Sequence, residues 1–162
     1  MAEYEIPDKP GVYTLVIRLA RGERAEIGRF GSHWFSEGLY TYTGSALGTG
    51  GLSLRGRVLR HLSSEKKMKW HIDYLLASRG VSVIAVVYAE TCSRMECSIA
   101  KSIACLEDAV SPVKGFGASD CRNGCESHLY HFPESDEEQL LRRLCEVYEE
   151  LGLSPKTLLP RD

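Results

Sequence analysis

Residues 11–19 read GVYTLVIRL, and residues 38–43 read GLYTYT. Both stretches are rich in β-branched and aromatic residues, and the second alternates Leu and Thr with Tyr, a pattern typical of strands. Side chains two residues apart in a strand point to the same face of the sheet, so Tyr40 and Tyr42 share one face. The sequence therefore predicts two neighbouring strands that bring Tyr13 and Tyr42 towards one site.

The rest of the chain adds helices around these strands. Residues 44–51 hold four glycines and predict a loop, after which residues 52–62 place apolar side chains along one stripe of a helix. The further predicted elements are, in chain order, a helix over 69–78, a buried strand over 81–89, a helix opened by a capping box at 93–96 and running to about 107, a loop over 111–127, a short strand over 128–132 and a C-terminal helix over 135–151. This order predicts one domain over 1–162 with a mixed α/β (α+β) fold, in which helices flank a small, largely antiparallel central sheet.

The length and the amino-terminal residues bound the class of protein. A chain of 162 residues suits one domain with its own core. Residues 1–8 lack the basic start and apolar stretch of a secretory signal, and no apolar run has the length of a membrane span. We therefore expect a cytoplasmic protein with no membrane partner, whose six cysteines are free thiols or metal ligands rather than disulfides.

Charge is unevenly distributed along the chain. The net charge of −2 is lower than is usual for a nucleic-acid-binding protein. Residues 53–69, however, carry six basic side chains against one glutamate, whereas residues 134–150 carry seven acidic side chains against two arginines. A local basic face can bind phosphates on an acidic protein, although both segments could also be ordinary solvated helix faces, which is the preferred interpretation for the acidic one. The candidate nucleic-acid-binding residues are Arg55, Arg60, Lys66, Lys67 and Lys69.

A cysteine- and histidine-rich segment follows the third helix. Its candidate zinc ligands are Cys121, Cys125, His128 and His131, which fall within eleven residues. Thiolate and imidazole are the ligands that zinc prefers, although the spacing is not that of a standard zinc finger. Cys97 or His33 could also contribute a ligand, and free thiols in a loop are the alternative. Cys97 and Cys105 fall in a predicted helix, where we expect them to be small buried apolar side chains.

Four motifs in order carry a resemblance to a known family. They are Gly11-Val12-Tyr13, Tyr42-Thr43-Gly44, the spacing Leu54-x-x-Arg57-x-x-x-His61, and Glu96 at the start of a later helix. The chain resembles the GIY-YIG nuclease superfamily. Residues 69–76 and 114–121 are similar to a narrower prokaryotic GIY-YIG-like family, of unknown function, whose members are sometimes fused to an endonuclease III-type DNA glycosylase. The resemblance covers residues 10–132, and the long gap between the two tyrosines implies an insertion over 20–37.

The resemblance implies a metal-dependent endonuclease that hydrolyses phosphodiester bonds in nucleic acid. In that interpretation Glu96 holds a divalent cation, Mg²⁺ or Mn²⁺, and Tyr13 helps to deprotonate the attacking water with Tyr42 or His61 assisting. Arg57 would pair with the charge that develops on the phosphate. The implied partners are DNA, in a repair or processing context, and a DNA repair protein.

Each of these residues also has a structural interpretation when it is taken alone. Tyr13 and Tyr42 could be ordinary strand aromatics, and Arg57 a surface helix charge. His61 could be a buried, hydrogen-bonded histidine. Glu96 could be the last residue of a capping box that begins at Ser93. A domain that keeps the fold but has lost turnover, and binds nucleic acid or a protein partner instead, is the alternative function.

Overall fold

The computed structural model describes residues 5–118, 121 and 123–160. Its main element is a five-stranded sheet with the strand order β6-β4-β1-β5-β7, in which every pair of neighbours is antiparallel. The strands are β1 (Gly11–Leu19), β4 (Gly38–Ala46), β5 (Val81–Glu90), β6 (Leu129–Phe132) and β7 (Lys156–Leu158). The predicted mixed α+β fold with a central antiparallel sheet is confirmed.

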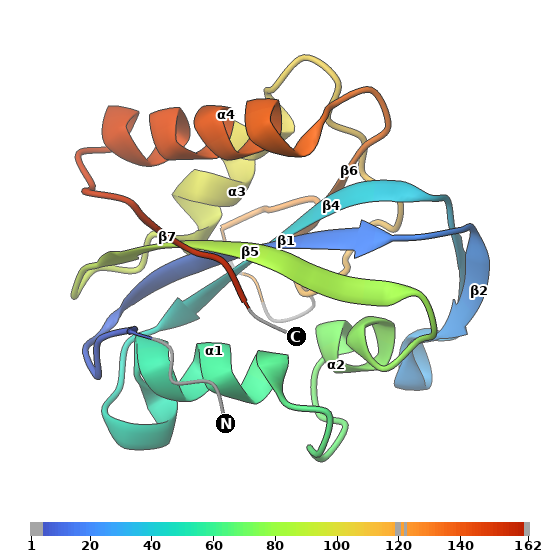
Figure 1. The fold of residues 1–162 in the computed structure, drawn as a ribbon, viewed down its shortest axis with the longest axis horizontal. Helices are drawn as coiled ribbons and strands as arrows, with labels where there is room; N and C mark the ends of the chain where they lie inside the picture. The colour runs from blue at the N-terminus through green and yellow to red at the C-terminus, as the bar shows by residue number, and fades with distance from the viewer. Residues whose placement is uncertain (1–4, 119–120, 122, 161–162) are drawn as a thin grey trace.

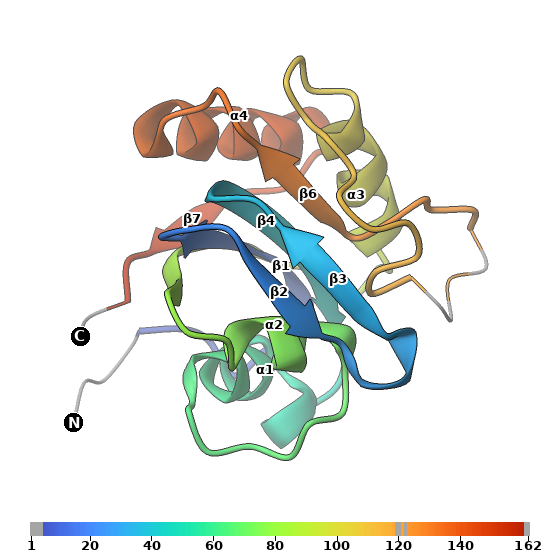
Figure 2. The ribbon, with the colours of Figure 1, turned by 90° about the vertical axis from the view of Figure 1, so that its right-hand side faces the viewer.

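Four α-helices cover the two faces of this sheet. The helices are α1 (Leu54–Leu62), α2 (His71–Leu76), α3 (Glu96–Ala104) and α4 (Glu137–Glu150). Figure 1 shows α1 and α2 below the sheet and α3 and α4 above it, and the view in Figure 2 agrees. The result is three layers, with a short 3-10 turn η2 (Gly50–Leu52) leading into α1.

Each face of the sheet has its own apolar core. On β1, Tyr13, Leu15 and Ile17 point to the side of α1 and α2, whereas Val12 and Val16 point to the side of α3 and α4. This alternation follows from the strand period of two residues, and it explains why β1 is apolar nearly throughout.

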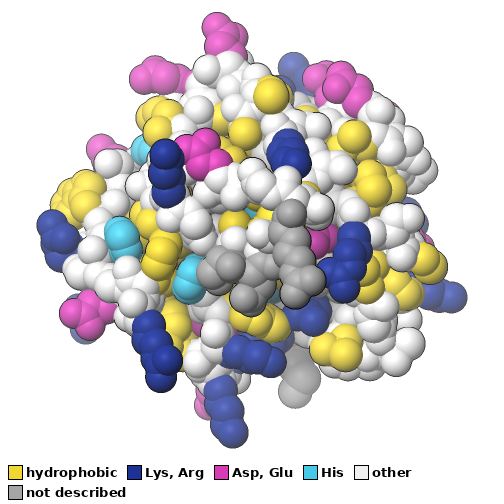
Figure 3. Space-filling view, turned by 180° about the vertical axis from the view of Figure 1, so that it is seen from behind, with side chains coloured by type: hydrophobic (Ala, Val, Ile, Leu, Met, Phe, Trp, Pro, Cys, Tyr) yellow, Lys and Arg dark blue, Asp and Glu magenta, His cyan; other side chains and the backbone are white. Residues whose placement is uncertain are grey.

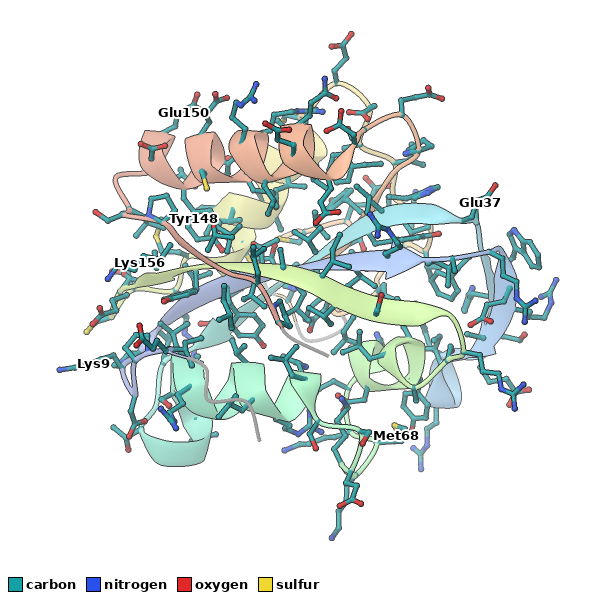
Figure 4. The ribbon with its side chains drawn as sticks, viewed as in Figure 1. Lys9, Glu37, Met68, Tyr148, Glu150 and Lys156 are labelled. Atoms are coloured by element: carbon teal, nitrogen blue, oxygen red, sulfur yellow. The ribbon has the colours of Figure 1, made fainter. Side chains whose placement is uncertain are left out.

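One buried tyrosine connects α4 to the sheet. Tyr148 lies between α4 and the strands in Figure 4, and its hydroxyl donates to the Val87 carbonyl oxygen at 3.2 Å. The same hydroxyl lies 2.9 Å from Thr14 Oγ1. Because both contacts are buried, they satisfy the only polar atom that this large side chain brings into the core.

The segment 20–37 forms a separate two-stranded sheet. Its strands β2 (Glu23–Glu26) and β3 (Ser32–Phe35) pair antiparallel around the 3-10 turn η1 (Gly28–Phe30). The hairpin packs beside α2, and Gly28 approaches the ring of Tyr74. Its status as an insertion stays a prediction.

Two helix starts differ from the prediction. The capping box from Ser93 to Glu96 is wrong, because α3 begins at Glu96 and its N-cap is Met95, without a side-chain cap hydrogen bond. At α4 the capping side chain is Asp136, whose carboxylate accepts from Gln139 N. Ser135 instead donates to Asp108 at 2.6 Å, and α4 starts at Glu137, two residues later than expected.

Other boundaries shift for identifiable reasons. α2 is shorter than the predicted 69–78 because Asp73 holds its start, accepting from the backbone N–H groups of Lys69 and Trp70. β4 continues to Ala46, since Gly44 pairs with β1 instead of opening the loop. Within the described residues, no helix is both long and apolar enough to cross a membrane.

Candidate functional site

Four of the residues expected at the active site line one pocket of about 200 Å³. Tyr13 comes from β1, Tyr42 from β4, Arg57 from α1, and Glu96 from the first position of α3. Tyr13 and Tyr42 lie on neighbouring strands, and α1 and α3 both contact β4, so Arg57 and Glu96 reach the same pocket. The other residues that line this pocket are Thr43, Gly44, Ser45, Trp70, Gly117 and His128.

The glycines of the two motifs are needed for close packing. Tyr13 lies directly opposite Gly44 in the β1–β4 pair. A Cβ atom on Gly44 would lie only 2.5 Å from the Tyr13 hydroxyl, and one on Gly11 would overlap the carbonyl oxygen of Ala89. Side chains at these positions would therefore displace Tyr13 or separate β1 from β5.

His61, the fifth residue expected at the active site, pairs with the first tyrosine. Tyr13 Oη lies 2.7 Å from His61 Nε2, and both side chains are buried. Burial lowers the pKa of His61 to about 3, an effect that the charge of Asp73 opposes. The imidazole is therefore neutral at ordinary pH, and its nitrogen can accept a hydrogen bond from the phenol.

Burial also keeps both phenols protonated. It raises the pKa of Tyr13 well above its ordinary value, and the neighbouring Tyr42 raises that pKa further, while Arg57 opposes the shift. The pKa of Tyr42 is raised for the same first reason, with Asp73 adding to the shift and Arg57 opposing it. Neither tyrosine is a phenolate at rest.

Several polar atoms around the pocket lack a partner. Within the described part of the chain, Arg57 Nε, Glu96 Oε2, Ser45 Oγ and His61 Nδ1 are buried without a hydrogen bond. Such atoms are rare in folded proteins, because an unpaired buried polar group destabilises the fold by about 1–3 kcal/mol. Three of these residues line the same pocket, which is the expected arrangement of a site that binds a polar ligand.

The basic residues expected to bind nucleic acid divide into two groups. Arg60 forms two 2.8 Å hydrogen bonds with the buried carboxylate of Asp73, and its guanidinium lies 4.2 Å from the Trp70 ring centre. Lys66 donates to three backbone carbonyls at the end of α1. The contacts of Arg60 and Lys66 therefore stabilise the fold. The other candidate nucleic-acid-binding residues, which are exposed, are Arg55, Lys67 and Lys69.

A second group lies at the start of α3. The ligand atoms of Cys97, Cys121, Cys125 and His128 all lie within 4.8 Å of one another, and this group could hold a metal ion. Cys97 Sγ is 3.4 Å from Cys121 Sγ and 3.8 Å from His128 Nε2. Burial lowers the pKa of His128, although Glu96 opposes the shift, so the imidazole is neutral as a metal ligand must be.

His131 is not part of this group, contrary to the sequence prediction. Its Nε2 lies 3.0 Å from the carbonyl oxygen of Glu37, and its ring stacks on Tyr40. Positions 128 and 131 are three residues apart in extended chain, so their side chains point to opposite faces. Cys97 takes the fourth place instead, and His33 lies elsewhere, against the carbonyl of Phe30.

One further expectation concerns an isolated cysteine. Cys105 is exposed at the end of α3 and is not the buried side chain expected from the helix pattern. His71 accepts from Gly117 N at 3.0 Å and stacks on Phe30, in keeping with a structural role. Of the segment 114–121 that resembles the narrower family, residues 119 and 120 lie outside the described residues.

Comparison with known families assigns the chain to a protein family. A family model described as a domain of unknown function, DUF123, matches residues 12–153. No curated protein and no solved structure matches the chain. The family match begins on β1, ends beyond α4 and includes every residue of the pocket and of the cysteine group. The chain therefore belongs to the DUF123 family.

Proposed function

We propose that the protein is a metal-dependent endonuclease of the GIY-YIG type that hydrolyses phosphodiester bonds in nucleic acid, with DNA as the preferred substrate. One observation carries the proposal: Tyr13, Tyr42, Arg57 and Glu96 line one pocket, although they come from four different elements. An ordinary set of strand aromatics and helix charges has no reason to converge in this way.

The pocket suits a hard divalent cation. Glu96 Oε2 is buried without a hydrogen bond, and Ser45 Oγ lines the same pocket and also lacks a partner. Oxygen ligands of this kind suit Mg²⁺ or Mn²⁺, which bind through one or two carboxylates together with substrate phosphate and water. When bound, the cation would polarise the scissile phosphate and stabilise the leaving oxygen.

Tyr13 and His61 provide a path for the proton of the attacking water. Because the Tyr13 phenol is protonated, it acts by relay: its own proton passes to His61 Nε2 as Oη takes a proton from water. The imidazole lies 2.7 Å from Oη and is neutral, so it is placed to accept that proton; burial opposes its protonation, and the charge of Asp73 favours it. Tyr42 lines the same pocket from β4 and would orient the same water.

Arg57 acts on the other side of the reaction. The water oxygen forms a bond to phosphorus, the bond from phosphorus to the leaving oxygen breaks, and its electron pair stays on that oxygen. Arg57 lines the pocket with its Nε unpaired, so its guanidinium is available to pair with the added phosphate charge. Trp70 lies 4.9 Å from this guanidinium and holds it in place.

The distribution of surface charge would favour binding of a negatively charged substrate beside the pocket. On the face shown in Figure 3, Asp and Glu side chains gather towards the top, over the layer of α4, whereas Lys and Arg are more frequent in the lower half. Arg55, Lys67 and Lys69 are exposed around α1 and would contact phosphates beside the pocket.

A non-catalytic binding domain is the second candidate. The burial of Tyr13 and Tyr42, 2% and 8% exposed, favours it, because little of either phenol reaches solvent. Such a domain would bind nucleic acid without cleaving it, with an affinity that falls steeply as salt is added. Cleavage by the wild type, compared with Tyr13→Phe and Glu96→Gln, separates the two candidates.

A further inference from the structure

The cysteine group beside α3 has the dimensions of a metal site. Tetrahedral zinc with Zn–S bonds of about 2.3 Å and a Zn–N bond of about 2.1 Å has ligand atoms roughly 3.5 to 3.8 Å apart. The contacts of Cys97 Sγ, 3.4 Å to Cys121 Sγ and 3.8 Å to His128 Nε2, are close to these values. Cys125 completes the set, since all four ligand atoms lie within 4.8 Å of one another.

A disulfide accounts for this arrangement less well. Cys97, Cys121 and Cys125 are all free thiols in the structure. A disulfide between Cys97 and Cys121 would involve only two of the four side chains. It would not explain why the Cys125 thiol and the His128 imidazole lie beside them. Three thiols and one neutral imidazole form a Cys₃His set, which is one of the ligand sets of structural zinc sites.

The four ligands come from three separate parts of the chain. Cys97 lies in the first turn of α3, and His128 immediately precedes β6. Cys121 and Cys125 belong to the long connection between α3 and β6, which among its described residues contains no helix or strand. A long connection without secondary structure is uncommon in a compact domain unless something orders it. A metal bound by these residues would attach the connection to both neighbouring elements.

The backbone of this region supports the ligand positions. His128 N donates to the Phe116 carbonyl at 2.9 Å, and the His128 carbonyl accepts from Thr43 N on β4 at 3.1 Å. These contacts fix the backbone that carries the His128 imidazole.

We propose that Cys97, Cys121, Cys125 and His128 bind one structural Zn²⁺ that attaches the connection between α3 and β6 to the start of α3. The protein fills all four coordination positions, so the zinc has no open position for water or substrate. This zinc is therefore separate from the hard cation expected at Glu96, although Cys97 and Glu96 are adjacent in sequence. The inference does not rest on the proposed nuclease activity.

Metal content provides the first test. The full chain, purified without a metal-affinity step, should contain about one equivalent of zinc by elemental analysis. Cys121→Ser and His128→Asn should lose it, whereas Cys92→Ser and Cys105→Ser are matched controls at exposed cysteines and should keep it. Glu96→Gln should also keep its zinc. Retention of zinc in Cys121→Ser, or its loss in Glu96→Gln, would overturn the assignment.

Wild-type protein provides a second test that does not depend on how the variants fold. With a thiol reagent, the exposed Cys92 and Cys105 should react at once. Cys97, Cys121 and Cys125 should react only after a chelator removes the metal. Replacement of zinc by Co²⁺ should give the visible absorption bands of a tetrahedral site with thiolate ligands. Folded, reduced protein that holds no zinc and shows no such bands with Co²⁺ would contradict the proposal.

These measurements use no nucleic acid. An inactive protein that contains zinc would therefore refute the proposed nuclease activity and leave the zinc site standing. An active protein without zinc would refute the zinc site and support the proposed nuclease activity.

Discussion

Tyr13 Oη lies 2.7 Å from His61 Nε2, and this contact joins the first strand of the sheet to the last turn of α1. It makes a buried phenol and a buried neutral imidazole into one unit. The unit opens into the pocket through Tyr13, whereas Glu96 and Arg57 reach the same pocket from two other elements.

Removal of the Tyr13 hydroxyl should abolish most of the activity without unfolding the protein. Tyr13→Phe keeps the ring in the core but removes the atom that would relay a proton to His61. Proton transfer by a positioned side chain contributes about 10²–10⁴-fold, so we expect a loss of cleavage rate in that range. Single-turnover cleavage measures the loss, and circular dichroism checks the fold. Unchanged cleavage by Tyr13→Phe would remove Tyr13 from the mechanism.

The glycine opposite Tyr13 gives an independent test of the same geometry. The added Cβ of Gly44→Ala would lie 2.5 Å from the Tyr13 hydroxyl and must displace it. We expect a loss of activity together with about 1–3 kcal/mol of destabilisation from overpacking. The matched control is Gly51→Ala, where no atom lies within 4 Å of the added Cβ. Equal effects of the two substitutions on activity and on the unfolding midpoint would show that Tyr13 can move freely.

The pair between Arg60 and Asp73 should be a major contributor to stability. Asp73 has a fully buried side chain and accepts two hydrogen bonds from Arg60. Asp73→Asn leaves the guanidinium without its charge partner and should destabilise the protein by about 3 kcal/mol. The exposed pair of Arg142 and Glu138 is the control, since Glu138→Gln should change the free energy of unfolding by less than about 0.5 kcal/mol. Denaturant unfolding measures both changes, and a small effect at Asp73 would contradict this account.

The buried His61 should make stability depend on pH. Burial lowers its pKa to about 3 in the folded state, below its ordinary value, so the unfolded chain binds the proton more tightly. Stability is therefore fully present above about pH 6.5 and falls as the pH drops towards 3, by about 1.4 kcal/mol per pH unit from this group. Unfolding curves between pH 4 and 7.5 should have a shallower pH dependence in His61→Gln than in the wild type. Parallel curves would show that folding does not lower the pKa of His61.

The sequence was sufficient for most of the sheet but not for the edge strand β7. The alternation at β4 and the apolar runs of β1 and β5 predicted those strands, because period-two burial appears directly in residue type. β7 was missed, since Lys156–Leu158 has three residues, two of them exposed, and shows no alternation. The start of α3 was misplaced because the Ser93 spacing fits a capping box that the chain does not form.

Some of the site residues could be assigned only from the tertiary structure. The order of the motifs indicated Tyr13, Tyr42, Arg57 and Glu96, and the structure brings all four to one pocket. Spacing alone assigned His131 to the cysteine group, although strand alternation turns it away. Cys97 is distant in sequence from Cys121, so the sequence offered it only as an additional ligand, next to the burial expected from its helix position.

A cleavage panel tests the central proposal most directly. Labelled single strand, duplex, nicked duplex, flap, four-way junction and RNA hairpin would be incubated with Mg²⁺ or Mn²⁺ and the wild type, Tyr13→Phe or Glu96→Gln. The account predicts metal-dependent cleavage of at least one DNA structure by the wild type and its loss in both variants. Folded wild type that binds the panel without cleaving it, or equal cleavage by all three proteins, would contradict the proposal.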